Sequence, residues 1–240
     1  MANLRLNNLV KIYAGREVVK GVDMILESGQ VVGLLGPNGA GKTTTFYMTV
    51  GMIRADAGKV LIDDEDITDA PMYQRARRGL GYLPQETSVF RKLTVEQNVL
   101  AILELLGVDR ADARQRTARL LEELGIARLA QRQASSLSGG ERRRLEISRA
   151  LATDPSFMLL DEPFAGIDPL AVIDIKQIIG HLRDRGIGVL ISDHNVRETL
   201  GVCDRAYILS EGKVIESGPP AHIASSDIAR RIYLGEEFRL

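Results

Sequence analysis

The sequence predicts an α/β fold in which a phosphate-binding loop joins a buried strand to a helix. The first observation is the octapeptide Gly36-Pro37-Asn38-Gly39-Ala40-Gly41-Lys42-Thr43, which fits the pattern G-x-x-x-x-G-K-[ST]. The second is that a short apolar run, 30–35, precedes this loop and a stretch without a helix breaker follows it. The third is that two later apolar runs, 156–160 and 187–191, also end in polar residues.

The loop contains the groups that bind a polyphosphate. Glycines let the backbone turn tightly and bring several N–H donors close to one anion, because they have no Cβ. Lys42 can reach the β and γ phosphates, and the hydroxyl of Thr43 can bind Mg²⁺. The helix that begins at about Lys42 offers its positive N-terminal end to the anion. The loop therefore predicts a nucleoside triphosphate as ligand.

Length and composition set limits on the function. The chain has 240 residues, of which 45% are hydrophobic, enough for one domain with a full core. A net charge of −1 gives no electrostatic reason to expect nucleic acid. The single cysteine, Cys203, excludes an internal disulfide and fits a reducing compartment. No apolar run approaches the roughly 20 residues that span a bilayer, so we expect any work at a membrane to depend on a partner.

The first 85 residues are predicted to form short strands around the loop helix. Residues 4–35 contain several strands, and Glu27-Ser28-Gly29 is expected to be a hairpin turn. Tyr13 either packs or stacks on a nucleobase, and local sequence favours packing. The cluster from Arg75 to Arg78 is expected to be a solvated helix face. The strand 79–83 breaks at Pro84, which places Gln85 in a loop.

Residues 86–152 have helical character. The segment Thr94-Val95-Glu96-Gln97 is a T-x-x-Q capping box, and apolar residues follow it at helical spacing. A second helix is predicted over about 112–124, with Gly125 as its C-terminal glycine. We expect a single domain, 1–240, in which this helical subdomain is inserted into a core formed by 1–85 and 153–240. Phe90 and Arg91 near its start are candidates for a partner contact, with ordinary packing as the alternative.

A second glycine-containing motif, Leu137-Ser138-Gly139-Gly140-Glu141, opens a helix that is predicted to continue through Arg149. Ser138 and Glu141 form an S-x-x-E capping box. Capping does not explain the two glycines, each of which costs roughly 1 kcal/mol against alanine inside a helix. Two residues without side chains in a first turn indicate that an anion approaches the backbone closely. The arginines at 142–144 are expected to be a solvated stripe.

Polar residues end two of the predicted buried strands. In α/β sheets ligands bind beyond the carboxyl ends of the strands, and successive strand residues point in different directions. With a phosphate loop present, Asp161 is the acid on the metal side, and Glu162 is free to polarise an attacking water. His194 follows the strand 187–191 and is a candidate for a γ-phosphate contact. His181 and His222 have no such context.

The order and spacing of GPNGAGKT, Gln85, LSGGE, FMLLDE and His194 resemble those of the nucleotide-binding subunit of the ATP-binding cassette (ABC) family, over nearly the whole chain. The resemblance implies a RecA-like phosphate-loop core, an N-terminal antiparallel β subdomain and an inserted helical subdomain that carries the LSGGE signature. It also implies an ATPase with ATP and Mg²⁺ as cofactors.

The resemblance further implies that two copies pair head to tail, with ATP between the loop of one and the LSGG helix of the other. By position, Tyr13 resembles the adenine-stacking aromatic residue, Asp168 the interface aspartate, and Glu162 with His194 the hydrolytic pair. Gln85 resembles the glutamine that meets Mg²⁺ and relays to the membrane partner. The implied metal ligands are Thr43, Gln85 and Asp161. The implied nucleotide-binding residues are Tyr13, Gly36, Pro37, Asn38, Gly39, Ala40, Gly41, Lys42, Thr43, Thr44, Gln85, Ser138, Gly139, Gly140, Glu141 and Asp168.

Within the family, five stretches resemble the ATPase subunits of bacterial lipopolysaccharide exporters, namely 43–48, 81–86, 161–169, 193–200 and 234–240. That resemblance implies a homodimer beneath two transmembrane permease subunits, which it contacts through the helical subdomain near Phe90 and Arg91. The implied location is the cytoplasmic face of the bacterial inner membrane, peripheral there and cytoplasmic when free. Neither nucleic acid nor the lipid cargo is expected to touch the chain.

The core motifs leave other functions open. An ATPase subunit of a branched-chain amino-acid importer has a similar sequence, and only the five stretches favour export. A soluble ABC-type switch acting on nucleic acid or ribosomes is a weaker alternative, since such relatives usually carry two cassettes or long insertions. A metabolic phosphotransferase would not need LSGGE.

Overall fold

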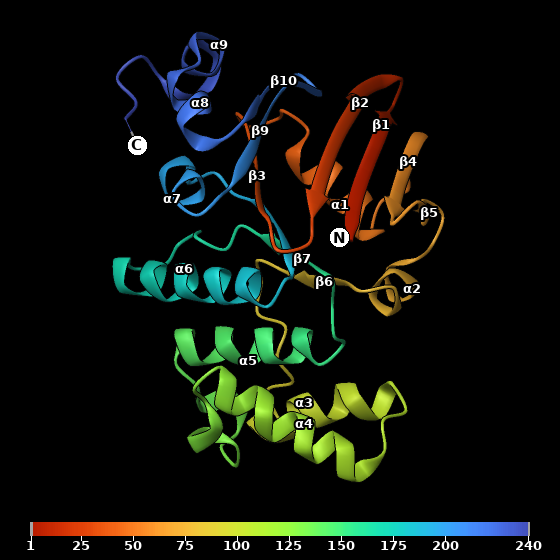
Figure 1. Cartoon of the computed structure of the whole chain (residues 1–240), viewed down its shortest axis with the longest axis vertical. Helices are drawn as coiled ribbons and strands as arrows, with labels where there is room; N and C mark the ends of the chain where they lie inside the picture. The colour runs from red at the N-terminus through yellow and green to blue at the C-terminus, as the bar shows by residue number, and fades with distance from the viewer. Residues whose placement is uncertain (1, 240) are drawn as a thin grey trace.

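The computed structural model describes residues 2–239, which form two β-sheets and a block of helices (Figure 1). The strands are β1 (Asn3–Tyr13), β2 (Arg16–Glu27), β3 (Val31–Leu35), β4 (Ala57–Ile62), β5 (Glu65–Asp66), β6 (Leu80–Leu83), β7 (Phe157–Asp161), β8 (Gly188–Ser192), β9 (Arg205–Ser210) and β10 (Lys213–Gly218). The helices are α1 (Lys42–Val50), α2 (Met72–Arg77), α3 (Val95–Leu105), α4 (Arg110–Glu123), α5 (Gly139–Leu151), α6 (Pro169–Asp184), α7 (Val196–Leu200), α8 (Pro220–Ser225) and α9 (Asp227–Ala229). The predicted α/β class is confirmed.

The central sheet has the strand order β10-β9-β3-β8-β7-β6. Strands β9, β3, β8, β7 and β6 run parallel, and β10 pairs antiparallel with β9. Every residue of β3, β7 and β8 is buried, as expected for parallel strands covered on both faces. The carboxyl ends of five neighbouring strands therefore lie along one edge of the sheet.

Alternate residues of the central strands serve two different cores. Val31 and Val189 belong to the apolar cluster that continues into α6 and the helical block. Their chain neighbours Val32 and Leu190 belong to the cluster that contains α1 and the antiparallel sheet. This division follows from the two-residue period of a strand, which points successive side chains to opposite faces.

The second sheet is antiparallel, with the order β2-β1-β4-β5. The expectation that residues 27–29 form a hairpin turn is wrong, because β2 pairs with β1 whereas β3 pairs with β8 and β9. These residues instead connect one sheet to the other. The hairpin lies at Ala14 and Gly15, which have φ angles of +48° and +80°. Glycine there gives the tight turn without the steric cost that a side chain would bring.

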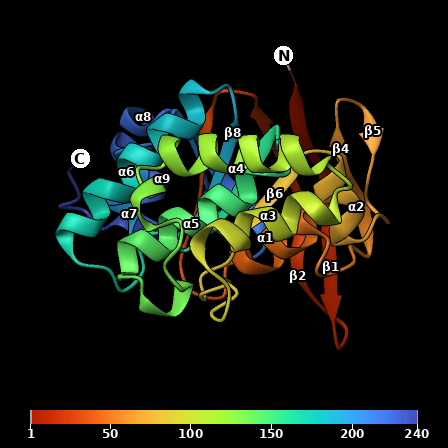
Figure 2. The same cartoon turned by 90° about the horizontal axis from the view of Figure 1, so that it is seen from below.

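The helical block contains α3, α4 and α5, and Figures 1 and 2 show it against one side of the central sheet. Thr94 caps α3 in a capping box, as predicted. Gly125 has φ +67° directly after α4, which agrees with its predicted role as a C-terminal glycine. One continuous apolar cluster joins these helices to α6 and the sheet. Among the described residues no helix has both the length and the apolarity needed to cross a bilayer.

Two arginines contradict the expectation of solvated basic faces. Arg75 is 2% exposed and donates to the carbonyl oxygens of Met48 and Thr49, each at 2.7 Å. It thereby satisfies carbonyl groups near the C-terminal end of α1, where a cation is favourable. Arg143 is also largely buried and donates to the Pro84 carbonyl oxygen and to Glu146. Local sequence showed the charge of these residues but not which backbone lay beside them.

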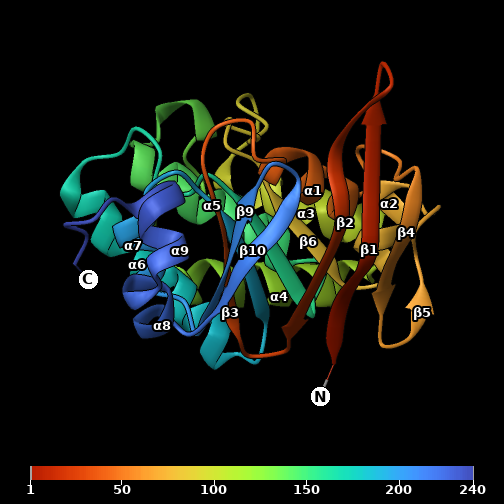
Figure 3. The ribbon, with the colours of Figure 1, turned by 90° about the horizontal axis from the view of Figure 1, so that it is seen from above.

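The C-terminal part begins with a hairpin of β9 and β10 around Glu211 and Gly212. It continues through α8, α9 and a π-helical turn, Arg230–Leu234. Figure 3 shows β9 and β10 between these C-terminal helices and the β1–β2 hairpin. The stretch 234–240 is described as far as residue 239, and Leu240 lies outside the described residues.

Candidate functional site

The predicted functional residues gather at the carboxyl edge of the central sheet. Strand β3 leads into the loop 36–41, β7 into Glu162, β8 into His194, and β6 into Gln85. Because these four strands are parallel neighbours, their ends bring together residues that are distant in sequence. This edge is where open α/β sheets bind ligands.

The loop after β3 requires glycine at particular positions. Gly36 has φ +147°, and a Cβ there would overlap the carbonyl oxygen of Leu209 in β9. Gly41, the N-cap residue of α1, has φ +100°, and a Cβ there would lie 2.9 Å from the carbonyl oxygen of Val18. Both glycines let the loop pass close to neighbouring strands and turn directly into the helix.

Lys42 lies on the first turn of α1 and points back into the loop. Its Nζ donates to the carbonyl oxygens of Gly36 at 2.6 Å and Pro37 at 3.0 Å. Burial lowers the pKa of Lys42, while the negative charges of Glu162 and Asp193 act in the opposite direction. The ammonium group is thus held at the loop, where the acids that follow β7 and β8 act on it electrostatically.

Glu162 is the centre of the acidic part of the site. Its Oε2 accepts a 2.9 Å hydrogen bond from Nε2 of Gln85 and lies 3.6 Å from Nδ1 of His194. The residue has φ +44°, an unusual conformation for a side chain other than glycine. Its carboxylate lies next to the glutamine and histidine that the sequence predicted. A carboxylate so placed, beside a polyphosphate loop, can accept a proton from water.

Asp161, directly before Glu162, points in another direction and is 5% exposed. Its Oδ2 accepts a 3.3 Å hydrogen bond from the hydroxyl of Tyr82. Burial raises the pKa of Asp161, and hydrogen bonds from Tyr47 and Tyr82 act in the opposite direction. Thr43 is exposed on the first turn of α1. Nothing in the local sequence links either tyrosine to the acid, so neither was predicted to belong to the site.

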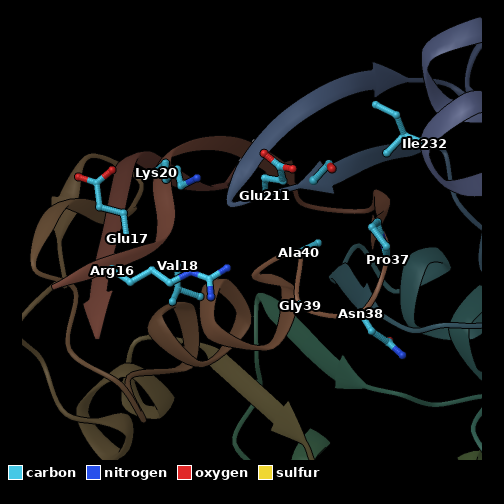
Figure 4. A pocket seen from close by; sticks show the side chains of 11 residues that line it. Arg16, Glu17, Val18, Lys20, Pro37, Asn38, Gly39, Ala40, Glu211 and Ile232 are labelled. Carbon is cyan, nitrogen blue, oxygen red and sulfur yellow. The ribbon is translucent and has the colours of Figure 1, made fainter. Parts of the chain in front are cut away.

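A cavity of about 830 Å³ opens on the outer side of the loop, and Figure 4 shows its walls. Most of its lining residues come from the β1–β2 hairpin, the β9–β10 turn and the C-terminal segment, so no local pattern connects them with the loop. Tyr13 is not among the lining residues but is 44% exposed near the end of β1, with Nζ of Lys11 5.3 Å from its ring centre. The ring is therefore available for stacking. The cavity is lined by Arg16, Glu17, Val18, Lys20, Pro37, Asn38, Gly39, Ala40, Ser210, Glu211 and Ile232.

The LSGGE motif lies apart from the loop. Ser138 caps α5, and the reciprocal hydrogen bonds with Glu141 confirm the capping box. A Cβ at Gly139 would meet nothing within 4 Å, and one at Gly140 would come no closer than 3.7 Å to Asp174. The chain itself therefore does not require glycine at either position.

A second cavity, of about 490 Å³, joins this motif to Gln85, Glu162 and Asp168. No residue of the loop 36–41 lines it. Asp168 caps α6 by accepting from the backbone N–H groups of Leu170 and Ala171 at 2.9 and 3.0 Å. Loop and signature thus face different spaces within one chain.

The candidate partner contact lies on the helical side. Phe90 is 43% exposed, and the Arg149 guanidinium lies 4.3 Å from its ring centre. Arg149 also lines a groove of about 250 Å³ with residues of α2, β6 and α3. Arg91 is exposed next to Phe90. The structure therefore leaves this aromatic residue and its neighbours accessible.

Comparison with known proteins gives consistent matches. Residues 19–165 match the family model described as ABC transporter. The lipopolysaccharide export system ATP-binding protein LptB of Escherichia coli (strain K12) is 58% identical over 241 residues, covering 100% of both chains. The protein of the same name from Haemophilus influenzae is 55% identical with the same coverage. A solved structure titled as the ADP conformation of MJ1267, an ATP-binding cassette of an ABC transporter, has a TM-score of 0.85 and 30% identity, covering 98% of this chain and 100% of that one.

Proposed function

The chain belongs to the ABC transporter family, and from this premise we propose that it is the ATP-hydrolysing subunit of a lipopolysaccharide exporter. The observation that carries the proposal is the full-length identity of 55–58% to proteins named for that export system. The site geometry described above agrees with it, since loop, acids and histidine meet at one sheet edge.

In the proposed reaction the loop and Lys42 hold the triphosphate of ATP. The backbone N–H groups at the start of α1 and the lysine ammonium neutralise its charge. The exposed ring of Tyr13 stacks on the adenine. Glu162 takes a proton from a water molecule, whose oxygen attacks the γ-phosphorus while the bond to the β-phosphate oxygen breaks. His194 contacts the γ-phosphate from the neighbouring strand.

The donor set also fits Mg²⁺. This ion is usually held by one or two carboxylates together with phosphate oxygens and water rather than by a complete protein cage. Asp161 supplies a buried carboxylate oriented by Tyr82, and Thr43 supplies an exposed hydroxyl. Within residues 2–239 no group of three or more His, Cys, Asp or Glu forms a cage of its own. When bound, Mg²⁺ would neutralise charge that develops on the phosphates.

We propose that two copies pair so that Ser138, Gly139 and Gly140 of one complete the loop site of the other. Two observations support this pairing. The loop and the signature face different cavities of the same chain. A Cβ at Gly139 would meet nothing within 4 Å and one at Gly140 only Asp174, at 3.7 Å, which leaves room for a close approach by phosphate. ATP then closes the pair, and loss of the γ-phosphate reopens it.

The proposed partners are two transmembrane permease subunits, contacted at the exposed surface around Phe90 and Arg91. Binding to these subunits would hold the chain at the cytoplasmic face of the bacterial inner membrane. The work of the ATPase is then to drive lipopolysaccharide out of that membrane toward the outer one, without touching the lipid itself.

The experiment that tests the ATPase is the substitution Glu162→Gln, which removes the proton acceptor but keeps the shape. We expect hydrolysis to fall by about 100-fold or more, with ATP binding retained and an ATP-dependent dimer on gel filtration. Hydrolysis at the wild-type rate would remove Glu162 from the mechanism. The cargo is tested by copurifying the chain with two polytopic membrane proteins. We expect the complex to release lipopolysaccharide when ATP is added. Transport of an amino acid instead would favour an importer.

A further inference from the structure

Asp193 is a buried acid that the reaction described above does not use. It lies between the last residue of β8 and His194, and its residue surface is 1% exposed. A carboxylate without water must have other hydrogen-bond donors, or burying it costs a large free energy. The hydrogen-bond donors around Asp193 therefore indicate which segments its side chain holds together.

Each oxygen of Asp193 accepts a hydrogen bond from a different segment. Oδ2 accepts from the backbone N–H of Phe164 at 2.8 Å, in the turn after β7. Oδ1 accepts from the backbone N–H of Asn195 at 2.7 Å, in the loop that leads into α7. One side chain therefore ties the turn that contains Glu162 to the loop that contains His194.

The turn after β7 needs such a tie. Glu162 has φ +44°, a conformation that side chains other than glycine rarely adopt, so the surrounding structure must hold it there. The backbone N–H of Glu162 donates to the carbonyl oxygen of Ser192 at 2.7 Å. With the Asp193 bond to Phe164, the turn is fastened to the end of β8 at two points, one on each side of Pro163.

Only a carboxylate fits both donors. An ionised Asp offers acceptors on both oxygens, whereas an Asn of the same shape has one acceptor and one N–H₂ donor. In either orientation, an Asn would direct its own N–H₂ group at a backbone N–H. The substitution therefore removes one tie while changing almost no volume.

We propose that Asp193 is a positioning residue, which holds Glu162 and His194 at the separation that hydrolysis requires. The present distance between Oε2 of Glu162 and Nδ1 of His194 is 3.6 Å. Asp193 acts through these two residues. The inference rests on the proposed ATPase function and adds the device that aligns its two hydrolytic groups.

The test compares Asp193→Asn with Asp204→Asn, a control at an exposed aspartate away from the site, in the full-length protein. Asp204 also accepts a backbone N–H, from Val31 at 2.8 Å, but at the start of β3 and β9, the edge opposite the site. We expect kcat of Asp193→Asn to fall by about 10- to 100-fold with KM for ATP within about twofold, because a small misplacement of reacting groups lowers kcat strongly. Asp204→Asn should keep wild-type kcat even where its melting temperature falls equally.

A second measurement distinguishes a loss of alignment from a general loss of structure in the variant. In the Glu162→Gln background, Asp193→Asn should still allow the ATP-dependent dimer, since nucleotide binding does not need the alignment. A wild-type kcat in Asp193→Asn, or equal loss in both Asn variants, would overturn the proposal.

A measurement on the unmodified site covers the case in which Asp193→Asn does not fold. The chain contains 5 phenylalanines, so protein labelled with ¹⁵N-phenylalanine gives a simple amide spectrum. Phe164→Leu identifies the signal of Phe164 by its loss. We expect this amide to exchange slowly with solvent, although it lies outside helix and strand, and rapid exchange would contradict the bond to Asp193. Absence of ATP hydrolysis in the wild-type protein would overturn the proposed function, while slow exchange would still support the bridge.

Discussion

The side-chain amide of Gln85 donates a 2.9 Å hydrogen bond to the carboxylate of Glu162, across 77 residues of sequence. Gln85 follows β6, on the side of the sheet where the helical block packs, and Glu162 follows β7. This one hydrogen bond links the residue before the helical subdomain, 86–152, to the proposed base.

This contact predicts an order of activities. Gln85→Ala removes a donor and should lower kcat about tenfold, because Glu162 loses an orienting partner. Gln85→Glu should be slower still, because it places a second carboxylate beside the first and disfavours the charged form of both. ATPase rates of the two purified variants give the order. Equal rates in wild type and both variants would show that the contact has no part in turnover.

The loop glycines predict a difference in stability. A Cβ at Gly36 would overlap the Leu209 carbonyl oxygen, whereas one at Gly39 would meet nothing within 4 Å. Gly39→Ala should cost about 1–2 kcal/mol through its positive φ alone. Gly36→Ala should cost more, since β9 or the loop must also move. Denaturant unfolding of the two variants tests the order, and a smaller loss for Gly36→Ala would show that the loop adopts another path.

The contact between Tyr82 and Asp161 predicts an effect on the proposed Mg²⁺ site. Removing its hydroxyl with Tyr82→Phe deprives the Asp161 carboxylate of one of the two tyrosine hydroxyls that orient it. We expect the affinity for Mg²⁺ to be about 10-fold weaker. The measurement is a Mg²⁺ titration in which fluorescence reports the binding of nucleotide. Tyr73→Phe is the control, because Tyr73 is 61% exposed and its hydroxyl meets only Gln74. Unchanged affinity in Tyr82→Phe would leave the tyrosine a packing role.

Arg75 predicts a large loss of stability from a residue that the sequence placed on the surface. Arg75→Met should lower the free energy of unfolding by about 2–4 kcal/mol, because buried carbonyl oxygens lose their donors. Arg77→Met on the same helix is the control, since Arg77 is exposed. Guanidinium denaturation measures both. Similar losses in the two variants would contradict the buried position of Arg75.

Asp66 predicts a pH-dependent contribution to stability. Hydrogen bonds from the side chain and backbone of Thr68, and from Lys59, lower the pKa of Asp66 from 3.8 to about 2. Because the folded pKa lies below the unfolded one, unfolding takes up a proton between these values, and the stabilisation present above about pH 4 is lost as pH falls toward 2. The stability difference between wild type and Asp66→Asn should therefore shrink over this range. NMR titration of the carboxyl group checks the midpoint, and a value near 3.8 would contradict the bonds to Thr68.

Several features could be predicted because they depend on residues that are near each other in sequence. The capping boxes at Thr94 and Ser138 and the end of α4 at Gly125 are correctly predicted. Each depends on backbone groups within a few residues of the side chain that satisfies them. The prediction of a hairpin turn at 27–29 is wrong because pairing between strands is not a local property.

The sequence by itself determined the phosphate loop, the signature motif and the acids that end β7, since these are patterns of consecutive residues. The tertiary structure alone decided that Arg75 is buried, that Tyr82 meets Asp161 and that Asp193 bridges the segments around Glu162 and His194. These contacts depend on the order of strands in the sheet, which brings β6, β7 and β8 side by side. A local pattern specifies what a side chain can do, and packing over long sequence distances determines which group it meets.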